Sequence, residues 1–526
     1  MIRINQIKLK PNQNESSLAK IICDMLNISN EELISWHIYK KSIDARKNEV
    51  FYVYSVNAEV KDQKKKLSKI KNNNIQEVQV PQDFQPVPYK TDKRPIIVGS
   101  GPTGLFSALM LAKSGAKPLI IERGKKVEER ISDIDAFWKE RRLDTESNIQ
   151  FGEGGAGTFS DGKLNTLIKD REGRGRHVLR EMVKAGAPEE ILYLNKPHIG
   201  TDRLRAVIIN LRKTIESYGG EFKFSERVTE IETNQSGIAS IITTKGNYKT
   251  DVAIFAIGHS ARDTFAMLNE HIQIIPKPFS VGVRIEHPRR MIDTSQYGDA
   301  IKQYDLPSAD YKMVHHCKNG RSVYTFCMCP GGIVTGASSE ERTVVTNGMS
   351  YYARNGENSN SALLVSITPE DFGSDHPLSG VEFQRRLERK AFLAGGENYN
   401  APAQLYKDFR SGIKSDGFGE VIPTYQPGVT FADLRMCLPS FIVDSLIEGI
   451  EDFGKKLKGF DRDDAVIIGV ETRSSSPVRL QRDERMMSSL KGLYVAGEGS
   501  GYAGGIMSSA IEGIKVAEII TGGAGK

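Results

Sequence analysis

Chemistry in this sequence is concentrated in a few segments that are rich in glycine, cysteine, or arginine and serine. The first is Gly99-Ser100-Gly101-Pro102-Thr103-Gly104. Its glycines permit a tight turn, close packing of a helix on a strand, and approach of the backbone to a pyrophosphate. Glu122 follows 18 residues after Gly104, where a carboxylate can accept hydrogen bonds from both ribose hydroxyls of an adenosine. These residues predict one end of a dinucleotide site.

The elements around this motif are those that a dinucleotide site requires. An apolar run ends at Val98, a helical pattern continues to about Ser114, and a second apolar run covers 118–121. The order strand, turn, helix, strand places phosphates at the helix N-terminus, whose unpaired N–H groups favour anions. The alternative is a βαβ unit whose glycines serve only packing.

A second glycine cluster covers residues 151–166, FGEGGAGTFSDGKLNT, and contains five glycines. A loop of this kind leaves backbone N–H groups free and suits a phosphate or a flat ring. The alternative is a flexible surface loop. Residues 152–157 repeat the GxGxxG spacing, but no apolar strand precedes them, so the sequence predicts no dedicated nicotinamide domain. NAD(P)H would then bind only transiently.

Residues 493–505 repeat the order of the first motif, an apolar strand followed by a glycine-rich turn and a helix. An apolar strand at 493–496 ends in Gly497-Glu498, and a glycine-rich turn opens a helix at about Gly504. A helix N-terminus stabilises electron density that is pushed onto an aromatic ring system, and the acid before it can bond a polyol chain. The two motifs together predict one long cofactor that lies across both.

Cys327 and Cys329 lie two residues apart in an expected strand, and hence on one face. Such a pair can exchange electrons with a cofactor or trap a substrate covalently. Buried cysteines also act simply as small hydrophobic residues, so both interpretations stay open.

The segment 471–479, ETRSSSPVR, is a second candidate for substrate contact. Arg473, Ser475 and Ser476 can bind a polar or anionic group, with Arg284 as an anion anchor. A structural turn in which Arg473 pairs with an acid explains the segment equally well.

Three sets of residues carry a resemblance to known flavoproteins. GSGPTG with Glu122-Arg123, AIGHSA, and LYVAGE followed by GYAGGIMSSAIEG resemble the three FAD signatures of the glutathione-reductase-like superfamily, in its two-domain branch. HIGTDRL, PFSVGVRIEHP, FCMCPGG, VTNGMSYYARNGENSNSALLVS and ETRSSSPVR resemble a bacterial family of FAD-dependent dehydrogenases, or NAD-utilising flavoproteins. The likeness covers nearly the whole chain.

The resemblance implies a role for each matching position. Gly99, Gly101 and Gly104 would hold the pyrophosphate, Glu122 the adenosine ribose, and Val228 the adenine. Glu498 would bond the ribityl or pyrophosphate region, although an aspartate is usual there. The full set of expected cofactor contacts is Gly99, Gly101, Pro102, Thr103, Gly104, Glu122, Arg123, Gly154, Gly155, Gly157, Thr158, Ser160, Asp161, Val228, Gly258, Gly497, Glu498, Gly504, Gly505, Ile506 and Met507.

The implied fold is α/β: an FAD-binding Rossmann-like domain of glutathione-reductase type, an inserted mixed α+β substrate domain, and a small N-terminal α/β domain. We expect a small basic domain of ferredoxin-like topology at 1–90, which ends in a proline-containing linker at 82–95. The FAD-binding domain would cover 91–275 and 456–526, with the insertion at 276–455.

Composition narrows the class of protein. No apolar run approaches the ~18 residues of a membrane helix, and MIRINQIKLK is no signal peptide, so we expect a cytoplasmic protein without a membrane span. Five cysteines, an odd number, fit a reducing compartment. His315, His316 and Cys317 are adjacent and cannot easily converge on one ion, so no metal is expected.

The expected function is that of an FAD-dependent oxidoreductase or dehydrogenase acting on a small organic substrate. Residues 1–90 contain 15 Lys and Arg against 10 Asp and Glu, and hence +5 of the net charge of +6. The run KDQKKKLSKIK at 61–71 is a solvated helix face or a surface for nucleic acid. The alternative function is therefore that of an FAD-binding protein that binds or modifies RNA, and a third is a scaffold that keeps FAD only for stability.

Overall fold

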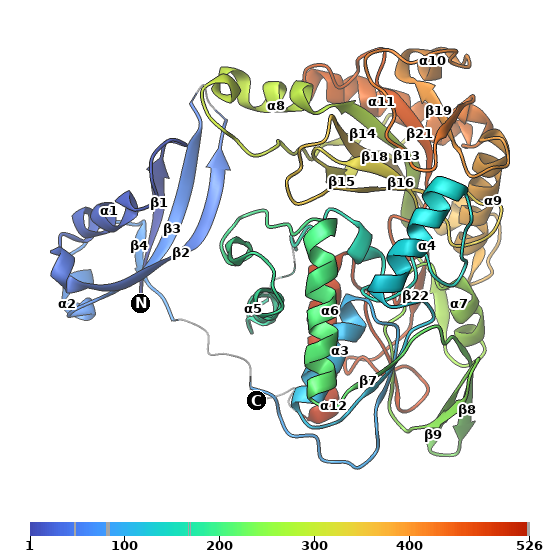
Figure 1. The fold of residues 1–526 in the computed structure, drawn as a ribbon, viewed down its shortest axis with the longest axis horizontal. Coiled ribbons are helices and arrows are strands. Elements are labelled where there is room, and N and C mark those ends of the chain that lie inside the picture. The colour runs from blue at the N-terminus through green and yellow to red at the C-terminus, as the bar shows by residue number, and fades with distance from the viewer. Residues whose placement is uncertain (47–48, 80–84, 167, 169, 523–526) are drawn as a thin grey trace.

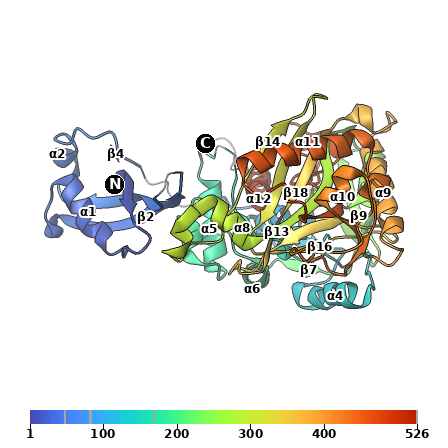
Figure 2. The same cartoon turned by 90° about the horizontal axis from the view of Figure 1, so that it is seen from above.

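The computed structural model describes residues 1–46, 49–79, 85–166, 168 and 170–522. Its first unit is a four-stranded sheet in the order β2-β3-β1-β4, which lies to one side of the molecule (Figures 1 and 2). Its elements are β1 (Ile2–Leu9), α1 (Ser17–Leu26), η1 (Asn30–Glu32), β2 (Leu33–Asp44), β3 (Phe51–Val60), α2 (Gln63–Leu67) and β4 (Ile75–Glu77). Backbone hydrogen bonds join it to the next unit, from the Lys41 N–H to Tyr193 and from the Asn195 N–H to Lys41.

The second unit contains a parallel sheet of five short strands in the order β23-β11-β5-β6-β7. Helices α3, α6 and α12 cover one face, and the sheet β8-β9-β10 with α7 covers the other. Strands buried on both faces are continuous apolar runs, as 96–98 and 119–121 are. The elements are β5 (Ile96–Val98), α3 (Pro102–Lys113), β6 (Leu119–Ile121), α4 (Val127–Glu140), η2 (Ala156–Phe159), α5 (Arg174–Lys184), η3 (Glu189–Leu192), α6 (Thr201–Ser217), β7 (Glu221–Lys223), β8 (Val228–Asn234), β9 (Gly237–Thr243), β10 (Asn247–Lys249), β11 (Ala253–Phe255), α7 (Arg262–Asn269), β23 (Leu493–Val495) and α12 (Ile506–Thr521).

The third unit is a sheet in the order β14-β15-β18-β13-β21-β19-β20, inserted between β11 and β23 and joined to the second unit through the pair β12-β22. Alternation along β13 puts Val281, Val283 and Ile285 into an apolar core with the helices, and polar residues on the opposite face. The elements are β12 (Ile274–Pro276), β13 (Phe279–Pro288), α8 (Arg289–Tyr297), η4 (Gly298–Lys302), β14 (Val314–His316), β15 (Ser322–Cys329), β16 (Ile333–Gly336), β17 (Thr346–Met349), β18 (Asn358–Ile367), η5 (Pro369–Asp371), α9 (Ser379–Ala394), β19 (Ala401–Leu405), α10 (Tyr406–Ser411), β20 (Val429–Phe431), η6 (Leu434–Met436), α11 (Ser440–Lys456), β21 (Val466–Glu471) and β22 (Val478–Leu480).

The expected mixed α/β class is confirmed, and so are the strand, turn, helix and strand around the first glycine motif. The glutathione-reductase-type arrangement and the domain boundaries stay predictions. The expected basic helix at 61–71 is shorter, because α2 covers only Gln63–Leu67. Part of the expected linker, 82–84, lies outside the described residues.

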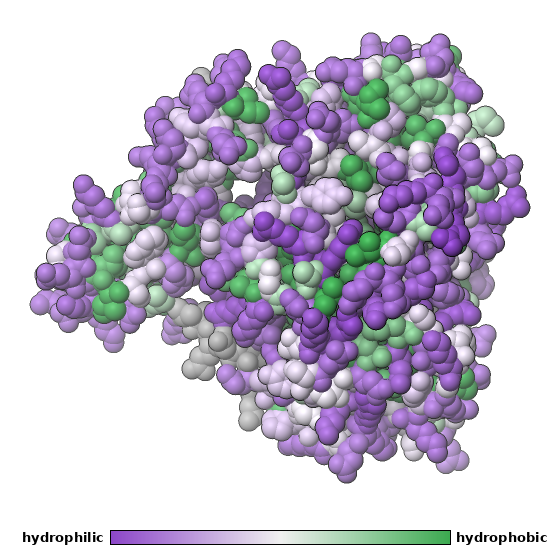
Figure 3. All heavy atoms as spheres, viewed as in Figure 1, coloured by the Kyte–Doolittle hydropathy of each residue, from purple (hydrophilic) through white to green (hydrophobic). Residues whose placement is uncertain are grey.

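Polar side chains cover most of the face shown in Figure 3, with apolar residues scattered among them. Among the described helices, none combines the length and the apolar character that crossing a membrane requires.

Truncation in the centre of the large sheet tests its core. Leu363, on β18, is fully buried, whereas Leu393, at the end of α9, is 58% exposed. We expect Leu363→Ala to lower the free energy of unfolding by about 2–5 kcal/mol, because it removes buried methyl groups and leaves a cavity. Leu393→Ala, the matched control, should change it by less than ~0.5 kcal/mol. Guanidinium chloride unfolding would measure both, and equal losses would contradict the assigned core.

Candidate functional site

The loops that follow three strands of the parallel sheet meet at its carboxyl edge. A side chain at Gly99 would come within 2.8 Å of the Ala256 carbonyl oxygen, and one at Gly497 within 2.4 Å of Thr103 Oγ1. A Cβ at Gly104 would lie 1.9 Å from the Gly99 carbonyl oxygen. Glycine is thus required where α3 begins, because the backbones touch directly.

The second glycine cluster is packed over this turn. The Gly154 N–H donates to the Ser100 carbonyl at 2.9 Å, and a Cβ at Gly155 would lie 3.1 Å from the Gly101 Cα. Arg130, which is fully buried, donates to the carbonyls of Asn148, Ile149, Glu153 and Gly155 at 2.7–2.9 Å. The cluster is therefore held by protein on its inner side, and the interpretation as a flexible surface loop does not fit.

Glu122 lies at the expected place after β6, but the protein itself already engages its carboxylate. The Ser100 N–H and hydroxyl donate to one oxygen at 2.9 and 2.8 Å, and the N–H groups of Gly124 and Gly152 donate to the other at 2.9 and 3.0 Å. Each carboxylate oxygen thus accepts two hydrogen bonds, which is its usual capacity. Glu122 binds the two glycine loops to each other, and a ribose would compete for it.

Open space borders the same edge of the sheet at three other glycines. Gly258, Gly504 and Gly505 are exposed, and a Cβ on any of them would meet no atom within 4 Å. Gly504 and Gly505 precede α12, which begins at Ile506. The N–H groups of the first helical turn lack partners within the helix, so α12 presents partial positive charge to this space.

His259 and Glu498 lie beside this open edge and contact each other. His259 Nδ1 is 3.2 Å from Glu498 Oε1, whereas the buried Nε2 has no hydrogen-bond partner among the described residues. Because a buried polar atom rarely lacks a partner, a bound group is a natural partner for Nε2. Glu512, which the sequence did not indicate, accepts a hydrogen bond from the Gly497 N–H at 2.7 Å and pairs with Arg482.

The segment 160–163 connects these loops to the inserted sheet. Asp161 pairs with Arg354 and, at 2.9 Å, with Lys163, whose ammonium also donates to the Met328 carbonyl. Burial by itself would raise the pKa of Asp161, but the charges of Lys163 and Arg354 outweigh it and hold the pKa below its usual range. Asp161 is therefore an anionic tie between the two units.

Cys327 occupies a bulge in β15, next to Lys163, with a positive φ of 42°. The residue is exposed, yet protein atoms surround the thiol, and this burial raises its pKa to about 12. Cys329 is buried, and its thiol donates to the Cys327 carbonyl at 3.3 Å. Both thiols are free, and that of Cys327 is protonated at neutral pH, so it can line a substrate cleft but is a weak nucleophile.

Arg284 is fully buried and holds the polar face of the large sheet together. Its guanidinium pairs with Glu471 at 2.8 and 3.0 Å and donates to Asn360 at 2.6 Å. These contacts leave it little capacity to anchor a substrate anion.

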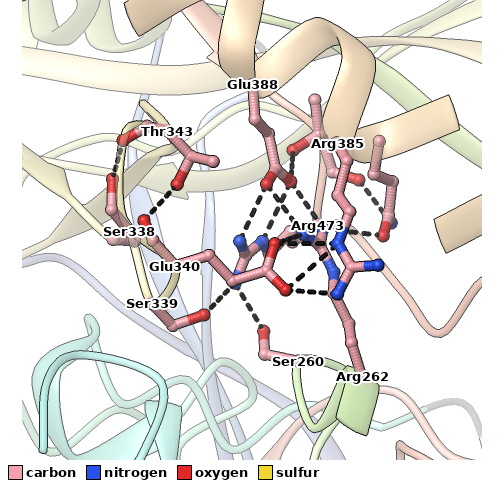
Figure 4. Close-up of polar contacts among 12 residues, drawn as sticks. Ser260, Arg262, Ser338, Ser339, Glu340, Thr343, Arg385, Glu388 and Arg473 are labelled. Carbon is pink, nitrogen blue, oxygen red and sulfur yellow. Dashed lines mark hydrogen bonds and ion pairs between the residues drawn. The ribbon is translucent and has the colours of Figure 1, made fainter. Parts of the chain in front are cut away.

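Arg473 belongs to a buried charge network that joins the second and third units (Figure 4). Glu388, on α9, accepts paired hydrogen bonds from Arg473 at 3.0 and 2.8 Å and from Arg262 at 2.7 and 2.9 Å. Arg262 also bonds Glu340, and Arg473 bonds Ser260 and Ser339. The interpretation of 471–479 as a structural turn gains support, with Glu388 as the acid, and a catalytic role for Arg473 stays a prediction.

Ser475 and Ser476 lie near the open glycine edge. The Ser476 hydroxyl donates to the Gly499 carbonyl at 3.0 Å, and the Lys277 ammonium is 3.5 Å from the Ser475 hydroxyl. Burial, together with the charge of Arg479, lowers the pKa of Lys277. Lys277 is a cation at this edge that the sequence did not indicate.

The remaining expected contacts have these positions. Arg123 pairs with Glu146 and Asp263 and stacks on Phe151. Pro102 begins α3, Val228 begins β8, and Met507 is buried in α12. The Thr103 hydroxyl donates to the Ser509 carbonyl, and Gly157 packs on Ile506. The hydroxyls of Thr158 and Ser160 donate to carbonyls of their own loop.

Comparison with known proteins adds two family matches. Residues 278–474 match the model of an FAD-dependent protein, C-terminal domain-like, and residues 1–59 match a domain of unknown function, DUF8436. An uncharacterized protein from Clostridium beijerinckii is 47% identical over 99% of this chain and 98% of its own length. The first match confirms the FAD-dependent class that the resemblance to known flavoproteins implies.

Solved structures show a more distant likeness. The glycine oxidase from Geobacillus kaustophilus is 11% identical, with a TM-score of 0.36, over 81% of this chain and 94% of its own. The L-proline dehydrogenase from P. horikoshii is 14% identical, with a TM-score of 0.36, over 84% and 96%. The glycerol-3-phosphate dehydrogenase from Bacillus halodurans, complexed with FAD, is 10% identical, with a TM-score of 0.36, over 83% and 65%.

Replacing Glu388 tests the charge network. Burial would raise the pKa of Glu388, but Arg262 and Arg473 hold it well below its usual range. Glu388→Gln leaves the buried Arg473 without its paired carboxylate and leaves Arg262 with Glu340 alone, so we expect it to lower the free energy of unfolding by about 3–5 kcal/mol at pH 7. Because the folded pKa is depressed, this contribution is complete above the unfolded pKa and declines as the pH falls below it.

The exposed residue Glu341 supplies the control. Glu341→Gln should leave the free energy of unfolding within ~0.5 kcal/mol of the original protein. Denaturant titrations from pH 7 down to about 4 would measure the effect, and a Glu388→Gln loss that grows on acidification would contradict the assigned ion pairs.

Proposed function

We propose that this chain moves hydride between NAD(P)H and a small organic substrate by way of non-covalently held FAD. The chain belongs to the same protein family as the uncharacterized Clostridium beijerinckii protein, and it is an FAD-dependent oxidoreductase. The observation that carries the proposal is the open edge formed by Gly258, Gly504 and Gly505, between the N-terminus of α12 and the loops after β5 and β11. FAD supplies the hydride chemistry when bound, and the chain supplies binding, orientation and electrostatics.

The residues present suit this cofactor in three respects. The N-termini of α3 and α12 offer two positive helix ends near one edge, one for phosphates and one for an electron-rich ring. Glycines at the open edge let a flat group lie against the backbone. His259 Nε2 is a buried group in need of a partner. The full engagement of Glu122 differs from the expected ribose contact, so we propose that Glu122 acts mainly by fixing the two glycine loops.

The substrate would lie on the side of the inserted sheet. Cys327 is exposed there, and Lys163, which pairs with Asp161, supplies positive charge beside it. A protonated thiol and a fixed ammonium favour a polar or anionic substrate. Arg473 would position this wall through Ser260, which follows Gly258 and His259 directly.

A separate nicotinamide domain does not enter the proposal. The second GxGxxG, at 152–157, opens the short η2 (Ala156–Phe159) instead of a long helix, and no strand precedes it directly in the described chain. NAD(P)H would therefore bind transiently at the open edge, where Lys277 and Arg479 offer positive charge.

Filling the open edge tests the cofactor assignment. Gly258 and Gly504 face open space without a positive φ, so a larger residue fits there without backbone strain. We expect Gly258→Leu and Gly504→Leu each to lower the affinity for FAD at least ~100-fold, because the new side chain would occupy the space proposed for the cofactor. A 100-fold loss corresponds to about 3 kcal/mol of binding free energy. The ratio of flavin to protein after gel filtration, and a titration of the apoprotein with FAD, would measure this loss.

Gly417 is the matched control, since it is exposed, faces open space and lies in a remote loop. Gly417→Leu should retain FAD as the original protein does. Normal FAD binding by both edge variants would contradict the proposed position of the cofactor.

Anaerobic mixing with NADH and with NADPH tests the electron donor. We expect one of them to bleach the visible flavin absorbance in a saturable way, which would also identify the donor. Reduction by dithionite alone would instead favour a protein that keeps FAD only for stability.

A second candidate, RNA binding by the first unit, is supported by its basic helix and by Arg3, which lies 3.4 Å from the centroid of the Tyr39 ring. Lys64 and Lys65 on α2 are exposed. Retention of single-stranded RNA that is lost in the Lys64→Glu, Lys65→Glu variant, with flavin reduction intact, would favour this candidate.

A further inference from the structure

Away from the open edge, the turn of the hairpin β14-β15 brings unlike side chains against α11. His315 and Cys317 alternate with His316, so they share one face of the chain, and Glu448 approaches them from the helix. The donor atoms of His315, Cys317 and Glu448 all lie within 4.8 Å of one another, the one set of three such side chains this close in the described part of the chain.

We propose that His315, Cys317 and Glu448 bind a divalent cation of the zinc type. Imidazole, thiolate and carboxylate are the three donor classes that zinc accepts from proteins, and three protein donors leave a fourth position for water. His315 Nε2 is 3.0 Å from Glu448 Oε1, close to the separation of two ligands on one zinc ion. The Cys317 sulfur must approach by roughly an ångström to complete the set.

Asp452 is the observation that separates this site from an ordinary surface ion pair. It lies one helical turn after Glu448, and its carboxylate is 3.2 Å from His315 Nδ1, the ring nitrogen opposite the one that faces Glu448, and 2.5 Å from the Lys456 ammonium. A metal-binding histidine characteristically donates its other N–H to a carboxylate, which fixes the ring and raises the basicity of the ligating nitrogen. Asp452 is thus a positioning residue.

The backbone around the three donors is itself fixed. Cys317 is 6% exposed, its N–H donates to the Arg321 carbonyl at 2.8 Å, and its thiol approaches the Ser445 carbonyl at 3.8 Å. The Asn319 amide donates to the Ser445 hydroxyl at 2.9 Å. The Lys318 N–H donates to the Glu448 carboxylate at 3.2 and 3.4 Å. The turn and the helix are therefore docked before a cation arrives, which lowers the ordering cost of binding.

Binding would displace the thiol proton of Cys317 to solvent, and the cation would join the edge strand β14 to α11 across 133 residues of sequence. The expected effect of the cation is to hold the outer edge of the sheet against α11. The proposal of a cation site does not rest on the proposed oxidoreductase function.

The test uses the full-length protein with its FAD, treated with EDTA and titrated with Co²⁺ and then Zn²⁺. We expect one Co²⁺ per chain, with the ligand-field absorption of a four-coordinate site and a thiolate charge-transfer band, and displacement by Zn²⁺. Cys317→Ser should abolish the charge-transfer band, and Glu448→Gln and His315→Ala should each lower affinity at least tenfold. Asp452→Asn should lower affinity 10–100-fold with the spectrum retained.

His316→Ala is the matched control, because His316 is exposed and bonds Ser322 on the opposite face. It should bind Co²⁺ as the original protein does. Thermal melting with and without Zn²⁺ separates loss of the site from loss of the fold: the original protein and His316→Ala should gain stability with Zn²⁺, and Glu448→Gln should not. Absence of stoichiometric Co²⁺ binding, or equal binding by Cys317→Ser, Glu448→Gln and His316→Ala, would overturn the proposal.

Discussion

Direct contact between backbones that are far apart in sequence is the constraint on which the rest of this structure depends. Where α3 begins, the chain touches the loop after β11, the loop after β23 and the glycine cluster at 151–166, and at each contact a side chain would crowd backbone or a neighbouring residue. Glycine at these positions lets the loops meet, and Glu122 and Arg130 then bind them through N–H groups and carbonyls. These contacts fix the loops around the open space at Gly258, Gly504 and Gly505.

Ion pairs set the relation between this edge and the inserted sheet. Glu388 sits between Arg262 of the second unit and Arg473 of the third, and Asp161 sits between Lys163 and Arg354 (Figure 4 shows the first group). A buried carboxylate with two cationic partners resists displacement of either partner, because moving one away would leave a buried charge uncompensated. These two groups of ion pairs join the second unit to the inserted sheet, and so fix the wall against which a substrate would lie.

Local patterns predict the parts of this fold whose cause is local. The apolar runs 96–98 and 119–121, the glycine turn and the start of α12 follow from residues within one segment, and the structure has them where the sequence indicates. The contacts of Arg473 and Glu122 depend on partners elsewhere in space. Nothing near Arg473 indicates Glu388, and the spacing of Glu122 fits a ribose as well as it fits the N–H groups of Gly124 and Gly152. Similarly, the positions of His315 and Cys317 in the sequence say nothing of Glu448, which lies 133 residues after His315 and which the fold brings beside it.

The position of α12 has a consequence for how the protein is made. Thr103 of α3 bonds Ser509 of α12, 406 residues later, and β23 pairs with β11 only when the same late segment is present. While the ribosome is still synthesising the inserted sheet, β11 has one unpaired side and α3 lacks its neighbour. A nascent chain must therefore keep an unfinished sheet from pairing with other chains until α12 has been synthesised.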